Sequence, residues 1–475
     1  MNYKLFISTA GIGSRVSGLG VIPNKSLLPI NYKAIISKIL DKFDSNVEVL
    51  VALGHEADLV KTFLKLAHPE RKFKFIKVDK YNGPGSGAGY TLEYCKKYLQ
   101  CPFIYTACDT LTIEKPKFKK FNWVGVSKTK ITERFLIFEK KSKYSGYSYF
   151  NKKRYFEISK TKKVFDAFIG LANIYDYKLF WKGFEANKSL EDNELQFSNG
   201  LHFLNNKIKL KKFKWLDTGT NETYVSTINY FRDRTHRKAG EVVYIIKNRV
   251  IKYFSDKSKC RILKQRGKKL KKNGPKLIKS PDNFLVYEYV KGKHLTEVNE
   301  KTFKKFLENL DNNFWERKTI NRIKFKKKCE NFYKKKTYER VLLAINQNPN
   351  IDKIEIINGI KIPSINKILS KVNWNYLSNG LPVSFHGDLQ PENIIVTKKK
   401  EFKLIDWRTD FSNLKYGDIY YDFSKLNHML TINTRKVLEG KISVNYKSSN
   451  EVRYYFQTQK KLLNFQKILY RFLEN

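Results

Sequence analysis

Residues 3–107 alternate short apolar runs with helical patterns, and this alternation constrains the fold more than any other feature of the chain. The segments follow one another at residues 3–9, 34–43, 47–53, 56–67, 72–78, 91–99 and 102–107. Strands that alternate with helices of this length are typical of a mostly parallel sheet with helices on both faces. The sequence therefore predicts an α/β fold for this part of the chain.

A second pattern begins after the polar segment 228–240, which ends in glycine. Strand-like runs come first, at EVVYIIKN, RVIKYF and FLVYEYVKG. From about residue 302 the periodicity is helical until a Gly/Asp-rich loop near residue 386. A length of 475 residues is enough for two or three domains with separate cores. We therefore predict one domain at residues 1–228 and another at residues 238–475.

The net charge of +48 comes from lysines spread along the whole chain, without a basic tail. This spread indicates a compositional bias, so we expect no specific nucleic-acid partner, although the charge favours polyanionic ligands such as nucleotides. The sequence contains no apolar run of 18 or more residues, so it predicts no membrane span. The N-terminus resembles a strand more than a signal peptide. The five cysteines are scattered, as expected for reduced thiols. Together these features predict a cytoplasmic protein.

A glycine-rich loop follows the first predicted strand. It contains Gly11, Gly13, Ser14 and Arg15, and such small residues with exposed amide groups can wrap a triphosphate at close range. Lys25 could reach the same phosphates and neutralise charge at the reacting bond. A lone loop of this kind also serves as an ordinary strand–helix turn. Its combination with Arg15 and the NKSLLP segment favours nucleotide binding, with Arg15 and Lys25 as catalytic residues.

Two aspartates fit the same site. Asp109 ends the run PFIYTACD, where ligand sites of parallel sheets lie, and Asp217 lies in WLDTGT. Two carboxylates that converge on one Mg²⁺ would bridge the attacking phosphate and the triphosphate, although each alone could equally be a helix cap or a turn residue. A further loop, YNGPGSGAGY, offers Gly85 and Gly87 for contact with a nucleotide base, and its alternative role is a surface turn.

The segment SFHGDLQPENIIVTKKKEFKLIDW at residues 384–407 carries the most specific motif. Phosphoryl transfer to a hydroxyl group needs a carboxylate near the nucleophile and Mg²⁺ on the β- and γ-phosphates. Asp388 is placed to orient the hydroxyl and accept its proton, while Asn393 and Asp406 supply oxygens for the metal. The segment therefore predicts an ATP-dependent phosphotransferase site with Mg²⁺ as its cofactor.

The N-terminal motifs resemble the sugar-phosphate nucleotidyltransferases, over roughly residues 1–228, and GIGSR with NKSLL is most similar to the phosphocholine cytidylyltransferase branch. The resemblance implies a Rossmann-like mixed sheet. It also implies a reaction in which an NTP and an organic phosphate give an NDP-linked product and pyrophosphate. The resemblance places the family's functional residues at Gly11, Gly13, Arg15, Lys25, Asp109 and Asp217. Its acceptor-phosphate lysine has Lys160 in EISK as the nearest candidate.

The C-terminal motifs resemble the aminoglycoside phosphotransferases and choline kinases, over about residues 238–475. The resemblance implies a bilobal protein-kinase-like α+β fold, with Asp388 as catalytic residue and with Asn393 and Asp406 as metal ligands. It places Lys252 on the ATP phosphates, and it makes the segment VYEYVKG, with Glu288, the hinge that binds adenine. Asp418 and Asp422 are implied to brace the catalytic loop. The segment after Lys252 departs from the family pattern because KCRILKQRGKKLKKNG contains no glutamate to pair with that lysine.

Together the two sites predict a bifunctional enzyme. The C-terminal domain would phosphorylate a small alcohol with ATP. The N-terminal domain would couple that phosphate to a second nucleotide, with CTP favoured, to give a precursor for surface polysaccharide or lipid. One alternative is a sugar kinase joined to an NDP-sugar pyrophosphorylase. Another is a basic nucleic-acid-binding protein with inactive domains, which would bind DNA or RNA in a salt-dependent way without turnover.

Overall fold

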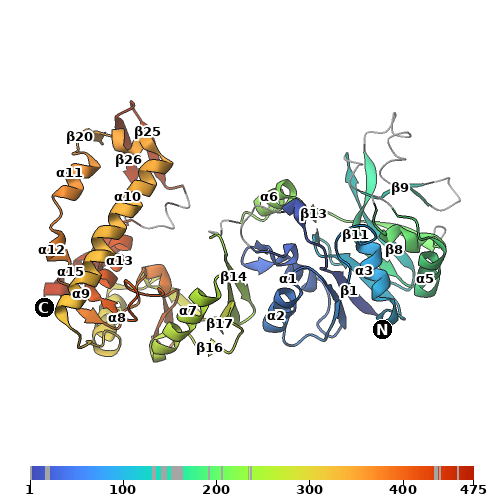
Figure 1. The fold of residues 1–475 in the computed structure, drawn as a ribbon, viewed down its shortest axis with the longest axis horizontal. Coiled ribbons are helices and arrows are strands. Elements are labelled where there is room, and N and C mark those ends of the chain that lie inside the picture. Colours follow the sequence, from blue (N-terminus) through green and yellow to red (C-terminus); the bar gives the residue numbers. More distant parts are fainter. Residues whose placement is uncertain are drawn as a thin grey trace. The chain divides into compact units, whose positions relative to one another are not determined.

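The computed structural model describes residues 3–16, 22–130, 135–140, 147–150, 164–190, 193–204, 207–233, 235, 238–432, 437, 440–456 and 459–474. It divides the chain into two compact units, Met1–Ser255 and Asp256–Asn475, and each is described by itself. Both units mix helices and strands, so the predicted α/β class is confirmed (Figure 1).

A nine-stranded mixed sheet forms the centre of the first unit in its described part. Its parallel strands, in spatial order, are β5 (Phe73–Lys77), β4 (Val49–Leu53), β1 (Lys4–Ser8) and β6 (Phe103–Ala107). The sheet continues with β11 (Phe165–Ile174), β8 (Asn122–Thr129), β9 (Ile137–Lys140), β10 (Tyr147–Phe150) and β12 (Ile208–Lys212). Every pairing of β11 is antiparallel, whereas β8 and β12 pair parallel. The parallel strands expected up to residue 107 are therefore confirmed, and the antiparallel pairings of β11 make the whole sheet mixed.

Helices cover both faces of this sheet. The predicted helices are present with shifted ends, as α1 (Ile35–Leu40), α2 (Ala57–Ala67) and α3 (Ala88–Tyr94), and α5 (Tyr177–Ala186) and α6 (Asn221–Tyr230) follow later. Leu50 and Ala52 of β4 face the core shared with α3 and α5. Because side chains alternate along a strand, Val49 and Val51 face the other side, where α2 contacts β4.

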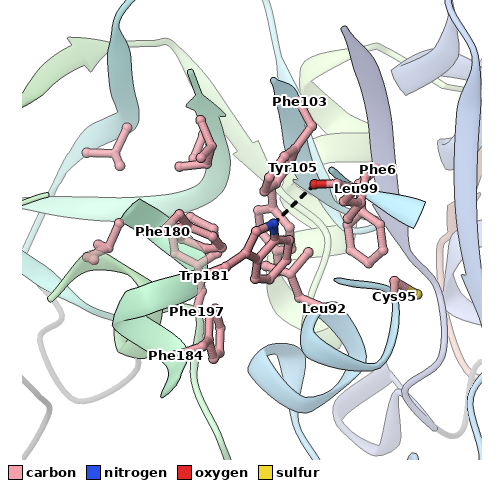
Figure 2. Packing of buried hydrophobic residues seen from close by; sticks show 14 of the residues in the cluster. Phe6, Leu92, Cys95, Leu99, Phe103, Tyr105, Phe180, Trp181, Phe184 and Phe197 are labelled. Atoms are coloured by element: carbon pink, nitrogen blue, oxygen red, sulfur yellow. Dashed lines mark hydrogen bonds between the residues drawn. The ribbon is translucent and has the colours of Figure 1, made fainter. Parts of the chain in front are cut away.

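An aromatic core fixes the strands that carry the first candidate site (Figure 2). The ring of Phe103 in β6 stacks on Trp181 of α5, with centroids 5.8 Å apart, and both side chains are almost fully buried. The indole nitrogen of Trp181 donates to the carbonyl of Leu99 (3.1 Å), so this large ring is buried without an unsatisfied donor. The core thereby holds β6, at whose end Asp109 lies, against α5.

A β-hairpin at the end of the first unit packs on α2 and on the segment after Lys25. Its antiparallel strands are β14 (Glu241–Ile246) and β15 (Arg249–Phe254). The ring of Tyr244 lies 4.7 Å from that of Phe63, and the amide of Ile245 donates to the carbonyl of Tyr32 (2.8 Å). The compact unit thus extends to Ser255, whereas the sequence pattern places this hairpin in the second domain. The predicted domain ranges, 1–228 and 238–475, stay predictions.

The second unit is largely helical between residues 300 and 386, as expected. Its helices are α7 (Lys257–Lys269), α8 (Glu300–Asn313), α9 (Arg322–Glu330), α10 (Lys336–Gln347), α11 (Ile365–Ser370), α12 (Trp374–Leu377), α13 (Ile419–Thr431) and α15 (Lys460–Glu474). Helix α15 contacts α8 and α13, and the rings of Phe303 and Phe465 stack 4.4 Å apart between α8 and α15 (Figure 1). In the described residues, no helix is both long and apolar enough to cross a membrane.

Short strands carry the loops of the second candidate site. The antiparallel strands β18 (Gly292–His294), β22 (Ile394–Thr397) and β23 (Phe402–Leu404) form one sheet. Two further pairs are β16 (Leu277–Ile278) with β17 (Phe284–Glu288), and β21 (Pro382–Val383) with β24 (Gly417–Asp418). The pairs β25 (Ile442–Tyr446) with β26 (Glu451–Phe456), and β19 (Ile356–Ile357) with β20 (Ile360–Lys361), make another small sheet. The turn between β22 and β23 brings the residues after β23 back to Asn393.

Candidate active sites

The first glycine-rich loop is held at the end of β1. Both the amide and the hydroxyl group of Thr9 donate to the carbonyl of Ala52, at 3.0 and 2.7 Å. Gly13 has φ +72°, and a β-carbon there would lie 3.3 to 3.4 Å from the aliphatic part of Lys25. Glycine suits this position on both counts, because other residues rarely adopt that φ and the loop packs on the lysine. Gly11, Ser14 and Arg15 are exposed on the same loop.

Asn24 positions Lys25, and sequence reasoning missed it. Its side chain is fully buried and its amide nitrogen donates to the carbonyl of His55 (2.9 Å). Its oxygen accepts from the amide and the hydroxyl group of Ser26, at 3.0 and 2.7 Å. Asn24 thus caps the short 3₁₀ helix η2 (Lys25–Leu27) and ties it to the loop after β4. An asparagine directly before a helical turn is the signal that could have identified it.

Lys25 and Asp109 form an ion pair. Lys25 Nζ lies 2.6 Å from Asp109 Oδ2, and the two side chains are only 18% and 19% exposed. Burial by itself lowers the pKa of Lys25, but the Asp109 charge outweighs it, so the pKa of Lys25 is raised. Burial likewise acts to raise the pKa of Asp109, and Lys25 overrides it, so that pKa is lowered. Both groups therefore stay charged near neutral pH, and Arg15 adds to the positive potential at Asp109.

The strand of Asp217 lies beside Asp109. Strand β13 (Trp215–Asp217) pairs antiparallel with β7 (Thr110–Thr112), which places Asp217 opposite Thr110. The hydroxyl group of Thr218 donates to the carbonyl of Asp109 (2.9 Å), and Asp217 Oδ1 accepts from the amide of Gly219 (2.9 Å). The main chain therefore brings the two predicted metal aspartates, Asp109 and Asp217, to neighbouring positions. The Asp217 carboxylate also stabilises the turn that follows it, through the amide of Gly219. Lys160, the candidate for the acceptor phosphate, lies outside the described residues.

The second glycine-rich loop packs on the segment 193–196. The amide of Gly85 donates to the carbonyl of Asn193 (2.6 Å), and that of Gly89 to Leu195 (2.8 Å). A β-carbon on Gly87 would lie 2.7 Å from the carbonyl oxygen of Leu195. Close approach of two backbones thus accounts for the glycines here. The predicted role of Gly85 and Gly87 in nucleotide binding stays a prediction.

In the second unit, His386 and Asp422 fix the loop before Asp388. The buried carboxylate of Asp422 accepts from the amides of His386 (2.8 Å) and Gly387 (2.7 Å), and from the indole of Trp315 (3.1 Å). The implied bracing role of Asp422 is seen in these contacts. His386 Nε2 lies 2.9 Å from the carbonyl of Ile405, which links the loop to the end of β23. Burial lowers the pKa of His386 to about 4, so this ring is neutral at pH 7.

Asp418 holds a neighbouring segment. Its Oδ2 accepts from the hydroxyl group of Tyr333 (2.6 Å), and its Oδ1 accepts from the amides of Leu381 (2.9 Å) and Tyr420 (3.2 Å). Asp418 is fully buried, and burial raises its pKa. It therefore fixes the chain before β21, whereas Asp422 holds the amides of the loop before Asp388.

Asp388 lies among three donors. Its Oδ1 accepts from Gln390 Nε2 (2.9 Å) and pairs with Lys425 Nζ (2.9 Å). Asn393 Nδ2 donates to the main-chain carbonyl of Asp388 (2.9 Å) and lies 3.3 Å from its Oδ2. With this nitrogen turned to Asp388, the amide oxygen of Asn393 is the atom suited to a cation. Sequence reasoning did not identify Gln390 or Lys425 as neighbours of Asp388.

Asn393 and Asp406 are brought together by the β22–β23 turn. The amide of Ile405 donates to the carbonyl of Asn393 (2.8 Å), which puts Asp406 one residue beyond this link. Asp406 has φ +60°, a strained conformation for a residue with a side chain and one that occurs often at functional sites. Its Oδ1 lies 3.5 Å from the hydroxyl group of Tyr287. The structure thus brings Asp388, Asn393 and Asp406 into one connected loop system.

Arg266 of α7 contacts several segments of this loop system, and sequence reasoning did not identify it. Its guanidinium donates to the carbonyls of Phe385 (2.7 Å), Arg408 (3.0 Å) and Lys415 (2.8 Å). The group also lies 4.4 Å above the centre of the Phe385 ring. Burial lowers the pKa of Arg266 to about 10, which leaves it charged. One side chain therefore connects the segments before Asp388 and after Asp406.

The remaining predicted residues lie on strands. Glu288 ends β17, where its amide donates to the carbonyl of Lys276 (2.9 Å) and its carboxylate pairs with Lys276 Nζ (3.0 Å). Lys252 is half-buried in β15, opposite Val243. Trp407, which follows Asp406, is buried, and its indole donates to the carbonyl of Leu263 (2.8 Å).

Both sites have donors suited to Mg²⁺. In the described residues, no group of three or more His, Cys, Asp and Glu side chains is arranged to hold a metal ion. Mg²⁺ is commonly held by one or two protein oxygens together with substrate phosphates and water. Asp109 with Asp217, and Asn393 with Asp406, are sets of this kind, and their oxygens fit such an ion.

No protein-family model matches the chain, and no curated protein matches it. Several solved structures resemble its N-terminal half. UDP-glucose pyrophosphorylase complexed with UDP-glucose is 16% identical, covers 49% of this chain and 99% of its own, and has a TM-score of 0.38. A putative glucose-1-phosphate thymidylyltransferase from Bacillus anthracis is 18% identical, with 50% and 98% covered and a TM-score of 0.39. CTP:phosphocholine cytidylyltransferase from Streptococcus pneumoniae is 14% identical, with 48% and 99% covered and a TM-score of 0.38.

Proposed function

We propose that this chain is a bifunctional enzyme with two phosphate-transfer sites. The C-terminal site phosphorylates a small alcohol with ATP, and the N-terminal site couples the resulting phosphate to a second nucleotide, with CTP favoured. The ion pair between Lys25 and Asp109 beside the Gly13 loop supports the N-terminal reaction. The network that joins Asp388, Asn393 and Asp406 supports the C-terminal reaction and a protein-kinase-like arrangement of that unit.

At the N-terminal site, an oxygen of the organic phosphate attacks the α-phosphorus of the NTP. The new P–O bond forms as the bond to the β-phosphate breaks, and pyrophosphate leaves. Lys25 and Arg15 neutralise negative charge that builds up on the phosphates, and the loop of Gly11, Gly13 and Ser14 presents main-chain amides to them. Mg²⁺ held by Asp109 and Asp217 would supply further charge neutralisation. The reaction depends on alignment more than on acid–base chemistry.

At the C-terminal site, the hydroxyl oxygen of the alcohol attacks the γ-phosphorus of ATP. The bond to the β-phosphate oxygen breaks, ADP leaves, and Asp388 accepts the hydroxyl proton. Mg²⁺ held by Asn393 and Asp406 would neutralise the triphosphate. Lys252 is proposed to bind ATP phosphates, and the strand of Glu288 the adenine. The contacts of Asp422 and Arg266 hold Asp388 in place for this step.

The two reactions form a sequence because the phosphorylated alcohol made at the C-terminal site is the acceptor that the N-terminal site needs. The NDP-linked product would serve as a precursor for surface polysaccharide or lipid, made in the cytoplasm. A sugar kinase joined to an NDP-sugar pyrophosphorylase is the alternative within the same chemistry. The nucleotide in the product separates the two, since CMP-containing product supports the first and UMP-containing product the second.

The test is to supply ATP, Mg²⁺, each common NTP and a panel of alcohols and sugars, and to measure ADP and pyrophosphate separately. Asp388→Ala should abolish ADP formation and leave pyrophosphate release from a supplied organic phosphate. Asp109→Ala should abolish pyrophosphate release and leave ADP formation. Loss of both activities in either variant, with the fold intact, would contradict the two-site proposal. Salt-sensitive binding to DNA or RNA without any turnover would instead support a nucleic-acid-binding protein.

A further inference from the structure

Positively charged side chains lie at the loop of the proposed catalytic aspartate, Asp388. Lys425 of α13 pairs with Asp388. Arg408 contacts the same loop, where its amide donates to the carbonyl of His386 (3.0 Å). Its side chain packs on Gly387, since a β-carbon there would lie 2.6 Å from Arg408 Cβ. Lys425 therefore lies at the Asp388 carboxylate, and Arg408 lies against the residue that precedes Asp388.

A third cation comes from α10. Lys336 Nζ lies 4.5 Å from the centre of the Phe332 ring, and the guanidinium of Arg408 lies 5.1 Å from the same ring. Phe332 belongs to a π-helical turn, Asn331–Lys335, that joins α9 to α10, and such turns occur often at functional sites. The turn thus sets Lys336 and Arg408 around one aromatic side chain near the catalytic loop.

These cations outnumber the acids that face them. The charged groups that act on Lys336 are Arg408, Arg340 and Lys425, all positive, and Asp410, which is negative. Burial, followed by the first two of these cations, lowers the pKa of Lys336 to about 8. Like charges held together in a half-buried place repel one another, and an anion bound among them would relieve that repulsion. The arrangement therefore suits a negatively charged ligand.

The lysine-rich composition alone does not account for this arrangement. Residues 322–340 contain nine Lys and Arg against two Glu, as a solvated lysine-rich helix could. Lys327 is an exposed example of that kind. Lys336, by contrast, is half-buried, and it lies on the ring that Arg408 also contacts. A cationic acceptor at this place would meet three like charges, those of Lys336, Arg408 and Lys425, and like charges repel.

We infer that the alcohol phosphorylated at the C-terminal site carries an anionic group, a carboxylate or a phosphate, which binds Lys336, Arg408 and Lys425. The inference rests on the proposed kinase function of that site and names its substrate class. The hydroxyl of such an acceptor would face Asp388 while its anionic group lies toward α10. A choline-like acceptor would be excluded by repulsion from the same three cations.

The test compares four alcohols on the full chain: glycerol 3-phosphate, glycerate, glycerol and choline. Calorimetry measures their binding, and ADP formation at saturating ATP measures their turnover. We expect one of the two anionic alcohols to bind and react best, with glycerol weaker and choline weakest. Lys336→Gln should weaken binding of the anionic alcohol and raise its KM by about tenfold, because one charge-assisted hydrogen bond is lost. The matched control Lys327→Gln should change neither.

The outcomes separate the inference from the proposed function. Binding of choline or glycerol more tightly than both anionic alcohols would overturn the inference, whether or not ADP forms. So would a Lys336→Gln variant in which only the KM for ATP rises, because these cations would then bind the triphosphate. ADP formation from choline would retain the kinase and refute the anionic acceptor. Tight binding of an anionic alcohol without ADP formation would support the anion site and refute the kinase.

Discussion

The hydroxyl group of Tyr244 donates a hydrogen bond of 2.6 Å to the main-chain carbonyl of Leu27. Leu27 ends the 3₁₀ helix that begins at Lys25, so the hairpin of β14 and β15 supports the segment that carries this lysine. The contact is fully buried, and water therefore does not replace the hydroxyl group if it is removed. A residue distant in sequence thus takes part in placing the ion pair of Lys25 with Asp109.

We expect Tyr244→Phe to weaken the first unit and its activity together. The phenyl ring keeps the packing on Phe63, but the Leu27 carbonyl loses its partner, which costs about 1–2 kcal/mol of unfolding free energy. Pyrophosphate release should fall several-fold as Lys25 shifts, while ADP formation is unchanged. Denaturant titration and the two product assays measure these effects. Tyr230→Phe, at a 44% exposed tyrosine, is the control and should change nothing. Unaltered pyrophosphate release in Tyr244→Phe would contradict the positioning role.

Arg266→Lys should impair the C-terminal site specifically. Lysine keeps the charge but has one ammonium group where the guanidinium reaches three chain segments at once. Loss of two carbonyl contacts should allow the loop of Asp388 to move, and ADP formation should fall by about tenfold or more. Pyrophosphate release serves as the internal measure of intact protein. Arg261→Lys, at an exposed arginine of the same helix, is the matched control. An equal loss of ADP formation in Arg266→Lys and Arg261→Lys would show that the effect comes from a general change in α7 and not from the three carbonyl contacts of Arg266.

The sequence predicted those parts of the molecule that local patterns determine. Strands up to Asp109 and the helices between them follow from apolar periodicity, and the motif HGDxxxxN marks Asp388 and Asn393 because their spacing lies within one loop. Arg266 and Lys425 were missed because each acts through contacts with residues far away in sequence. A lysine or arginine in a chain with 93 of them carries no local signal. The antiparallel strands after residue 107 carry no local signal of their direction either, since strand direction depends on long-range pairing.

Asp422 should make ADP formation depend on pH near 6. Burial raises its pKa from an ordinary 3.8 to about 6. Between these values the folded protein binds the proton more than the unfolded chain does, so this group's contribution to stability falls as the pH rises through that window and is constant above it. The ionised carboxylate accepts three N–H groups, and protonation removes part of that capacity. ADP formation should therefore decline as the pH drops below about 6, while pyrophosphate release does not.

The variant Asp422→Asn tests this assignment. It mimics the neutral acid, so its ADP formation should be low and should show no inflection near pH 6. Rates are measured from pH 5 to pH 8 with both product assays on the same preparation. If the inflection persists in Asp422→Asn, another group is responsible for it.

The anion site predicts a second pH dependence, opposite in direction. Because burial and the neighbouring arginines lower the pKa of Lys336 to about 8, this lysine loses its charge at a pH where ordinary lysines keep theirs. The phosphate of glycerol 3-phosphate is a dianion above pH 7, since its second pKa is about 6. Its KM should therefore rise by about tenfold between pH 7 and pH 9, as one charge-assisted contact is lost. The KM of glycerol should not change. Lys336→Arg retains its charge over this range and should give a flat profile, and an equal rise in that variant would contradict the role of Lys336.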